Sequence, residues 1–386
     1  MFCGRALRVV AGLIAVPVPM CLACLGAVPG TPVTALSFSP DDSSLVASAR
    51  QAVTVRSTPD GKIRETLACH LAKVNALAFS PNGMLLAIGG GTPGESGGVR
   101  LFEWKTRERA MEFGDFEDVV TCVTFSPEST RLAVASADHF VQVFSIEPAS
   151  AKLKLDFTLE GHSGPVLGVA FSPDGKLLVS ASADRSLKVW EAVGGKLLRT
   201  FSHHTATVHT VTVRPRLAGD DRSWFCASGG DDRTVRIWQP EIGRMVRIVR
   251  QPEGTILALA YSRDGGRLFS AGSEGIIRVI DGESDVILQK WKAHDDWIYS
   301  LALSPNGKIL ATGDWQGIIK LWDASSDVIR PITSDEPGSA VPQPKERSLQ
   351  RLRGSVEIKR RAATLNGPSH GHADVDVCAP IRPGSS

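Results

Sequence analysis

The chain of 386 residues is poor in tyrosine, in cysteine and in net charge. It has two tyrosines and seven cysteines, and the cysteines are too few and too scattered to form a disulfide scaffold. Its 43 Lys and Arg residues nearly balance its 41 Asp and Glu residues, which leaves a net charge of +2. A dedicated nucleic-acid binder normally carries a strong basic excess, so this composition argues against specific nucleic-acid binding.

The chain also lacks several short motifs of catalytic and cofactor sites. It has no His-Glu-x-x-His zinc helix and no Cys-x-x-Cys-His haem attachment. The stretch Gly89–Gly98 is rich in glycine but lacks the Gly-Lys-Ser/Thr of a phosphate loop, and it lies between two predicted strands. We therefore interpret it as a surface loop, and we expect no enzyme activity, no cofactor and no metal site.

The two ends of the chain differ from its middle. Residues 1–29 hold Arg5 and Arg8 followed by an apolar run over residues 9–28, which is typical of a secretory signal peptide. A run of this length could also anchor the chain in a membrane. If the leader is used, we expect an extracytoplasmic protein (periplasmic, secreted or membrane-anchored), and otherwise a cytoplasmic one. Residues 337–386 are basic and rich in Pro and Ser, without strand periodicity, which predicts a disordered tail.

The middle of the chain, residues 30–336, consists of seven similar segments. Each has a short alternating apolar run, a turn and a second run. The marker residue that ends the first run recurs every 41–48 residues, at Phe38, Phe79, Phe125, Phe171, Val213, Tyr261 and Leu303. A period of about 40–45 residues is typical of a four-stranded propeller blade.

The fourth segment shows how one period divides into strands. Residues 166–171 alternate as a strand does, and Ser-Pro-Asp-Gly at 172–175 predicts a tight turn. Three further strands follow at residues 177–182, 187–190 and 196–201. One such sheet cannot bury both of its faces, whereas seven sheets packed radially can. The sequence therefore predicts an all-β fold, a seven-bladed β-propeller of four-stranded antiparallel blades.

These segments resemble the WD-repeat family across residues 33–333, and their FSPDGKLL-type turns resemble those of bacterial members. The family is marked by Gly-His before the first strand and Trp-Asp at the end of the third. The resemblance implies that His, Ser or Thr, Asp and Trp form a buried hydrogen-bonded tetrad within a blade. It assigns to these tetrads His162, Ser180, Asp184 and Trp190; His204, Ser228, Asp232 and Trp238; and His294, Thr312 and Trp322.

Other segments depart from the tetrad pattern. In segment seven Gln316 stands where Asp is expected, so we expect a gap in that tetrad. Segment two keeps His70 but has Phe102 in place of Trp. Segment one has no recognisable tetrad, and segments three and six keep few of the four residues. We expect blades one, two, three and six to depend on apolar packing instead.

The resemblance implies a non-catalytic scaffold, a monomeric ring that binds a protein or peptide on its narrow face. That face bears the loops before the first strands and the turns between the second and third strands. Blade seven places three aromatic residues there. They are either interface anchors or side chains that fill the expected gap at Gln316. The predicted partner-binding residues are Trp297, Tyr299, Trp315, His209, Asp231 and Asn75.

Two other functions stay open. An accessory or sensor propeller of a bacterial surface assembly would use the leader as its anchor. A propeller hydrolase or lyase would need acids, a nucleophile or a metal converging on the central channel. The predicted inner strands, such as VTALSF, VLGVAF and ILALAY, supply few such groups.

Overall fold

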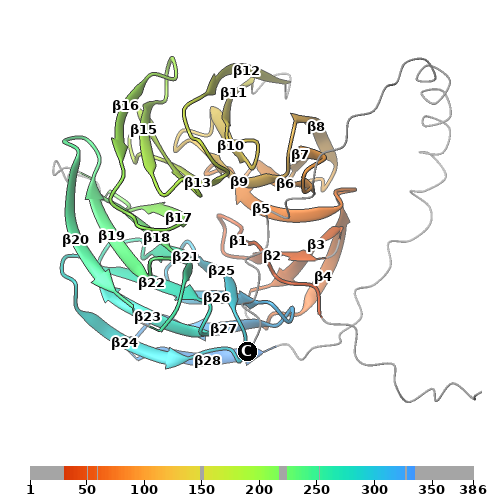
Figure 1. Ribbon diagram of the computed structural model, residues 1–386. Helices are drawn as coiled ribbons and strands as arrows, with labels where there is room; N and C mark the ends of the chain where they lie inside the picture. Colours follow the sequence, from red (N-terminus) through yellow and green to blue (C-terminus); the bar gives the residue numbers. More distant parts are fainter. Residues whose placement is uncertain are drawn as a thin grey trace, which may run out of the picture.

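The computed structural model describes residues 30–334, apart from residues 50, 59, 148–151, 217–223, 252 and 327. Within that part it confirms the seven-bladed propeller: seven four-stranded antiparallel sheets stand radially around a central axis (Figure 1). The predicted leader and tail lie outside the described residues, so what was expected of them stays a prediction. No helix long and apolar enough to cross a membrane occurs in the described part of the chain.

Each blade uses four strands that are consecutive in the chain, and the first strand of each lies innermost. The strands are β1 (Leu36–Phe38), β2 (Ser44–Ala49), β3 (Ala52–Ser57), β4 (Ile63–Ala68), β5 (Lys73–Phe79), β6 (Leu85–Thr92), β7 (Ser96–Glu103), β8 (Arg109–Phe116), β9 (Val120–Phe125), β10 (Arg131–Ser136), β11 (Val141–Glu147), β12 (Lys152–Leu159), β13 (Val166–Phe171), β14 (Leu177–Ser182), β15 (Leu187–Glu191), β16 (Leu197–Phe201), β17 (Val208–Val213), β18 (Cys226–Gly230), β19 (Thr234–Gln239), β20 (Arg244–Arg250), β21 (Ile256–Tyr261), β22 (Arg267–Gly272), β23 (Ile276–Asp281), β24 (Ile287–Lys292), β25 (Ile298–Leu303), β26 (Ile309–Asp314), β27 (Ile319–Asp323) and β28 (Arg330–Ser334).

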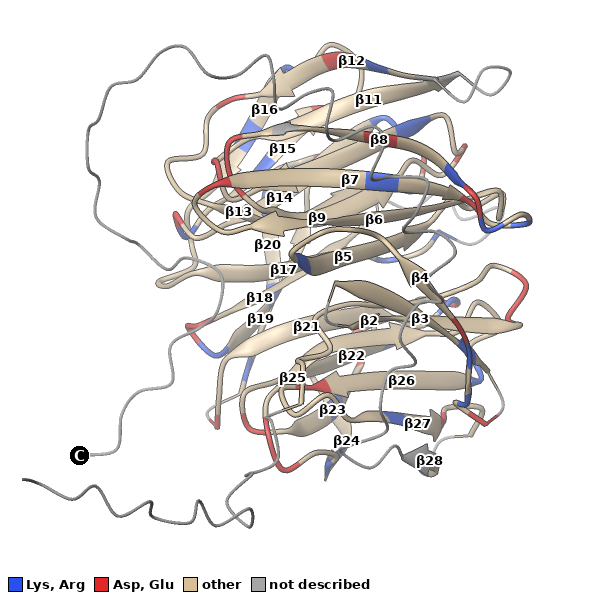
Figure 2. Cartoon of the chain, turned by 90° about the vertical axis from the view of Figure 1, so that its right-hand side faces the viewer, with Lys and Arg blue, Asp and Glu red and all other residues tan. Residues whose placement is uncertain are grey.

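The second strand of a blade is buried on both faces, whereas the outer strand is largely exposed. In blade four every residue of β14 after the first is buried, while all residues of β16 except the last are exposed. The apolar clusters therefore span neighbouring blades: Val143 of blade three shares one cluster with Phe171 and Trp190 of blade four. Figure 2 shows the complementary distribution of charge, with Lys, Arg, Asp and Glu mainly in turns and on outer strands.

The predicted Ser-Pro-Asp-Gly turn recurs around the ring with the same hydrogen bonds. In blade four the Ser172 hydroxyl donates to Asp174 Oδ1 (2.6 Å) and accepts from the Leu177 amide (2.9 Å). Gly175 closes the turn at a φ of 69°, a backbone conformation that favours glycine. Equivalent serine-centred turns begin at Ser39, Ser80, Ser262 and Ser304.

The ring closes between blades seven and one without an exchange of strands in the described residues, because β1 belongs to blade one and β28 to blade seven. Among the described residues, three hydrogen bonds cross this junction. The Val33 amide donates to the Asp314 carbonyl (3.0 Å), Ser300 Oγ donates to the Val33 carbonyl (2.8 Å), and the Asn306 amide donates to Asp42 Oδ1 (3.1 Å). Leu45 and Leu321 are fully buried in the cluster that spans it. Side-chain packing and hydrogen bonds therefore close the ring together.

We predict that Leu321→Ala lowers the free energy of unfolding by about 2–5 kcal/mol, the usual cost of truncating a fully buried leucine. Chemical denaturation of the variant would measure this loss. Leu155→Ala is the control, since Leu155 lies on an outer strand with 46% of its surface exposed and its truncation should change stability little. A Leu321→Ala protein as stable as the wild type would show that the junction does not depend on this packing.

Candidate binding face and the tetrads that support it

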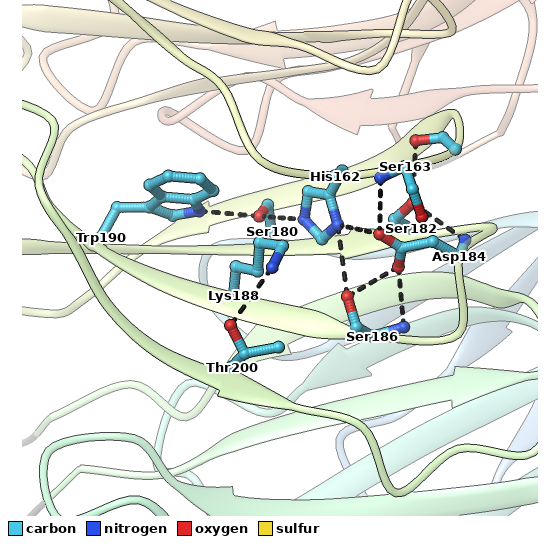
Figure 3. A network of polar contacts seen from close by, with 10 residues as sticks. His162, Ser163, Ser180, Ser182, Asp184, Ser186, Lys188, Trp190 and Thr200 are labelled. Carbon is cyan, nitrogen blue, oxygen red and sulfur yellow. Dashed lines mark hydrogen bonds and ion pairs between the residues drawn. The ribbon is translucent and has the colours of Figure 1, made fainter.

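The four residues assigned to the blade-four tetrad are hydrogen-bonded in series (Figure 3). Trp190 Nε1 donates to Ser180 Oγ (2.9 Å), which also lies 2.8 Å from His162 Nε2. The other ring nitrogen, His162 Nδ1, lies 2.8 Å from Asp184 Oδ2. Because the carboxylate can only accept, His162 Nδ1 donates to Asp184. The other nitrogen of the neutral imidazole then accepts from the Ser180 hydroxyl, which itself accepts from the Trp190 indole. Every polar group of this buried series is paired.

Blade five repeats the series with nearly the same distances. Trp238 Nε1 lies 2.8 Å from Ser228 Oγ, His204 Nε2 lies 2.7 Å from that oxygen, and His204 Nδ1 lies 2.7 Å from Asp232 Oδ2. Burial alone would raise the pKa of the Asp232 carboxyl. The hydrogen bonds from His204 and Thr234 and the attraction of His204 outweigh that effect and hold the pKa well below its usual range.

This lowered pKa predicts a pH dependence of stability. The unfolded Asp232 carboxyl has a pKa of about 3.9. Because the folded pKa is lower, the stability that Asp232 contributes is present above about pH 4 and is lost as the pH falls toward the folded pKa. Asp232→Asn should therefore cost about 1.5–3 kcal/mol near neutral pH and about 1 kcal/mol less than that at pH 3, where the unfolded carboxyl is mostly protonated and the folded one is still ionised. Urea unfolding of both proteins at several pH values measures the difference.

The exposed Asp285 supplies the control for that experiment. Asp285→Asn should leave the free energy of unfolding nearly unchanged across the same pH range. If the cost of Asp232→Asn were the same at pH 3 as at pH 7, the carboxylate would not be the stabilising species.

Blade seven has no gap, contrary to the expectation based on Gln316. Asp314, the last residue of β26, supplies the carboxylate from two residues earlier: its Oδ2 lies 2.8 Å from His294 Nδ1. Thr312 Oγ1 lies 2.7 Å from His294 Nε2 and accepts from Trp322 Nε1 (3.0 Å). The tetrad is therefore complete without Gln316. The side-chain amide of Gln316 instead donates to Asp296 Oδ2 (2.7 Å).

Two variants separate positions 314 and 316. Asp314→Ala should destabilise the protein by about 3–5 kcal/mol, because it removes one partner of a buried hydrogen-bonded pair. Gln316→Ala should cost about 1 kcal/mol or less, because Gln316 is half-buried and loses one hydrogen bond. Thermal melting of the two variants tests the order. If Gln316→Ala cost more than Asp314→Ala, Gln316 rather than Asp314 would be the fourth member of the tetrad.

Blade six has the apolar packing that we expected and also holds a polar network that we did not expect. Gln251 donates its side-chain amide to Ser270 Oγ (2.7 Å) and accepts from Arg278 Nη1 (3.3 Å). Arg278 is 1% exposed, and its guanidinium forms ion pairs with Glu274 and with Glu253 (2.5 Å). A buried arginine needs such partners because an unpaired charge is costly in the interior.

Blades one to three replace the tetrad differently. The tetrad tryptophan lies on the third strand, opposite the start of the second strand, in blades four, five and seven. The same position holds Arg56 in blade one, Phe102 in blade two and Phe144 in blade three. Blade three packs Phe144 with Phe116, which stands in the His position. His70 of blade two is exposed, so keeping a histidine in the sequence did not mean keeping a tetrad.

The narrow face is organised by a hydrogen bond that recurs from blade to blade. The first residue of the turn after the second strand donates its amide to the carbonyl of the residue just before the first strand. In blade seven these residues are Trp315 and Trp297 (2.9 Å), and in blade five they are Asp231 and Thr207 (2.9 Å). Blades three, four and six form the same bond, so the positions aligned from the sequence are equivalent in space.

A β-bulge stands next to this bond at the narrow-face end of the inner strands of blades two to seven. A bulge inserts one residue and changes the direction of its side chain. The bulged residues are Asn75, Thr121, Leu167, His209, Leu257 and Tyr299. They include three of the six predicted partner-binding residues, which the sequence placed at equivalent positions without indicating a bulge.

The three aromatic residues of blade seven form a row. The ring centroids of Trp297 and Tyr299 lie 6.1 Å apart with 33° between their planes, and those of Tyr299 and Trp315 lie 5.5 Å apart with 37°. All three side chains are half-buried. Offset, inclined rings at these distances attract one another, so the row is an ordered surface rather than three independent side chains.

The other predicted binding residues lie in blades five and two. His209 Nε2 lies 2.8 Å from Asp231 Oδ1, and the Asp231 carboxyl is 38% exposed. Burial raises the pKa of Asp231, but hydrogen bonds from His209, Thr255 and Thr207 more than offset this and lower it. Asn75 donates its side-chain amide to the Val120 carbonyl of the next blade (3.3 Å), a contact that links two blades. A binding role for these residues stays a prediction.

The glycine-rich stretch of blade two forms the β6–β7 hairpin. Within it Gly94-Glu95-Ser96-Gly97-Gly98 has the Gly-x-Ser-x-Gly spacing of a nucleophile elbow. Ser96 is the exposed first residue of β7 and follows a strand-to-strand turn, whereas the elbow needs a turn from a strand into a helix. Across the described ranges, no group of three or more His, Cys, Asp and Glu could hold a metal ion.

Comparison with known proteins identifies the repeats. The family model described as "WD domain, G-beta repeat" matches more than half of the chain, at residues 61–103, 110–145, 153–191, 195–239, 243–281 and 286–323. The chain belongs to the WD-repeat family. Each matched WD repeat starts in or just before the outer strand of one blade and ends in the third strand of the next. WD repeats and blades are therefore offset by one strand.

Curated relatives cover parts of the chain. The small ribosomal subunit protein RACK1y of rice is 33% identical over 170 residues, which are 42% of this chain and 47% of the rice protein. Transducin beta-like protein 3 of cattle is 32% identical over 263 residues, 65% of this chain and 32% of the cattle protein. The COMPASS component SWD3 of budding yeast is 25% identical over 224 residues, 54% of this chain and 64% of the yeast protein.

Two of these names, the small ribosomal subunit protein and the COMPASS component, describe parts of larger assemblies, and none of the three names describes an enzyme. The chain spans from about a third to less than two thirds of their lengths. All three come from eukaryotes, so they lend no support to the expected bacterial origin, which stays a prediction with the signal peptide.

Proposed function

We propose that this chain is a non-catalytic interaction platform that binds a protein or peptide on the narrow face of the propeller, with blade seven as the main contact. The observation that carries this proposal is the aromatic row of Trp297, Tyr299 and Trp315. Aromatic side chains with polar tips are common anchors of protein interfaces.

The completed tetrad supports this interpretation over gap filling. The row could have compensated for a missing carboxylate next to His294, but Asp314 occupies that position. Blade four has a complete tetrad as well and carries Pro165, Leu167 and Ala183 at the matching rim positions. A blade with a full tetrad therefore does not require three aromatic rings on its rim.

The test begins with affinity capture from the native host, followed by identification of the partner and measurement of its affinity. Trp297→Ala or Trp315→Ala should weaken binding by about 2 kcal/mol or more, the usual threshold for a dominant interface residue. Both variants should keep the melting temperature, because both side chains lie outside the blade cores.

Leu167→Ala is the matched control, since Leu167 occupies in blade four the bulged position that Tyr299 occupies in blade seven. It should bind like the wild type. If both tryptophan variants lost stability but kept full affinity per folded molecule, the row would be a packing element and the blade-seven site would be abandoned.

A further inference from the structure

We infer that the blade-seven row recognises a basic side chain, an arginine or lysine presented by the partner's peptide chain. This inference rests on the proposed function and specifies the chemistry of the same site. Its first basis is the row itself, because the faces of tryptophan and tyrosine rings attract cations, and tryptophan most of all.

The second basis is the charge beside the row. Asp295 and Asp296 directly precede Trp297 in the loop before β25, and Asp295 is exposed. The turn that carries Trp315 continues with Gln316, Gly317 and Ile318 and brings no basic residue. Two carboxylates next to three aromatic rings complement a cation and disfavour an anionic partner such as a phosphate or a nucleic-acid backbone.

The third basis is that one of these carboxylates is fixed in place. Asp296 Oδ1 accepts from the Trp297 amide (2.9 Å), and Asp296 Oδ2 accepts from the Gln316 side chain (2.7 Å). Asp296 thereby joins the two loops that carry Trp297 and Trp315. A binding site held before the partner arrives loses less entropy on association than a mobile one.

The displaced tetrad carboxylate makes this arrangement possible. In blades four and five the residue at the place of Gln316 is the tetrad aspartate, Asp184 or Asp232, which faces its own histidine. In blade seven Asp314 performs that role from the strand, so the turn can carry a neutral amide. An aspartate at 316 would place a second carboxylate against Asp296 and repel it.

Two lysines near the site, Lys320 and Lys292, donate to backbone carbonyls. Lys320 Nζ donates to the Ala293 carbonyl (2.7 Å), and Lys292 Nζ donates to the Glu274 carbonyl (2.8 Å).

The test uses the full chain and four labelled probes: tri-arginine, tri-lysine, tri-glutamine and tri-glutamate peptides with blocked ends. Fluorescence anisotropy at low and at physiological salt gives the affinities. Tri-arginine or tri-lysine should bind about tenfold or more tightly than tri-glutamine, and tri-glutamate should bind least, with the preference decreasing as salt rises.

Three variants assign the binding to the row. Trp297→Ala and Asp296→Asn should each weaken binding of the basic peptide by about tenfold, and Gln316→Asp should weaken it although it adds a negative charge. The last result distinguishes an ordered site from simple attraction to a negative surface, which Gln316→Asp would strengthen. Leu167→Ala should have no effect, and a melting curve for each variant confirms that it is folded.

Equal binding of tri-arginine and tri-glutamine, no binding of any probe, or basic-peptide binding that Trp297→Ala leaves unchanged would overturn the inference. The inference on the ligand can fail while the proposed function holds. If the captured partner needs Trp297 and Trp315, but replacing its arginines and lysines leaves its affinity unchanged, the interaction platform stands and the basic ligand is wrong.

Discussion

Both faces of every blade are apolar, and only the neighbouring blades can cover them. This requirement follows from the second strands, which are buried on both sides, and from clusters such as the one that joins Val143 to Phe171 and Trp190. Burial of apolar area is the dominant favourable contribution to folding, and in this protein it is obtained only when the ring is complete. The outer strands complete each sheet but contribute less to the core.

The polar residues inside the blades have a different role. A tetrad buries a carboxylate, an imidazole, a hydroxyl and an indole at one end of a blade, and such a network stabilises a structure only when each member is paired. Blades four, five and seven pair every member, and blade six holds a different network in which Gln251 and Arg278 are paired. The tetrad also holds the turn between the second and third strands, so the rim of the narrow face has a fixed geometry.

The sequence was sufficient to predict the blades because the turns are local. Ser172 and Asp174 bond within a few residues, and their spacing is visible in the chain as a repeated motif. The polar networks were predicted less well, because a side chain can reach the same point from different backbone positions. Asp314 lies two residues before the expected place, and Gln251 lies one residue before the histidine position, so an alignment by spacing misses both.

The sequence was also sufficient to predict only part of the aromatic row. Its three residues were found because they fall at equivalent rim positions. Their arrangement in a row depends on a bulge at Tyr299 and on a hydrogen bond between two loops, and neither leaves a clear mark on the sequence. Residues that act together across loops are visible only once the backbone has placed them.

The junction between blades seven and one bears on how the chain is made. In a ring closed by strand exchange, one blade waits for a strand from the opposite end of the chain. Here blade one has all four of its strands once the ribosome has delivered Ala68, and each later blade completes its sheet in order. Only lateral packing against blade seven is delayed until β25 to β28 have been made. The hydrogen-bonded strand pairs all join neighbours in the chain, which keeps them local and favours rapid formation of each sheet. The exposed flank of blade one is thus the surface that a nascent chain must protect the longest.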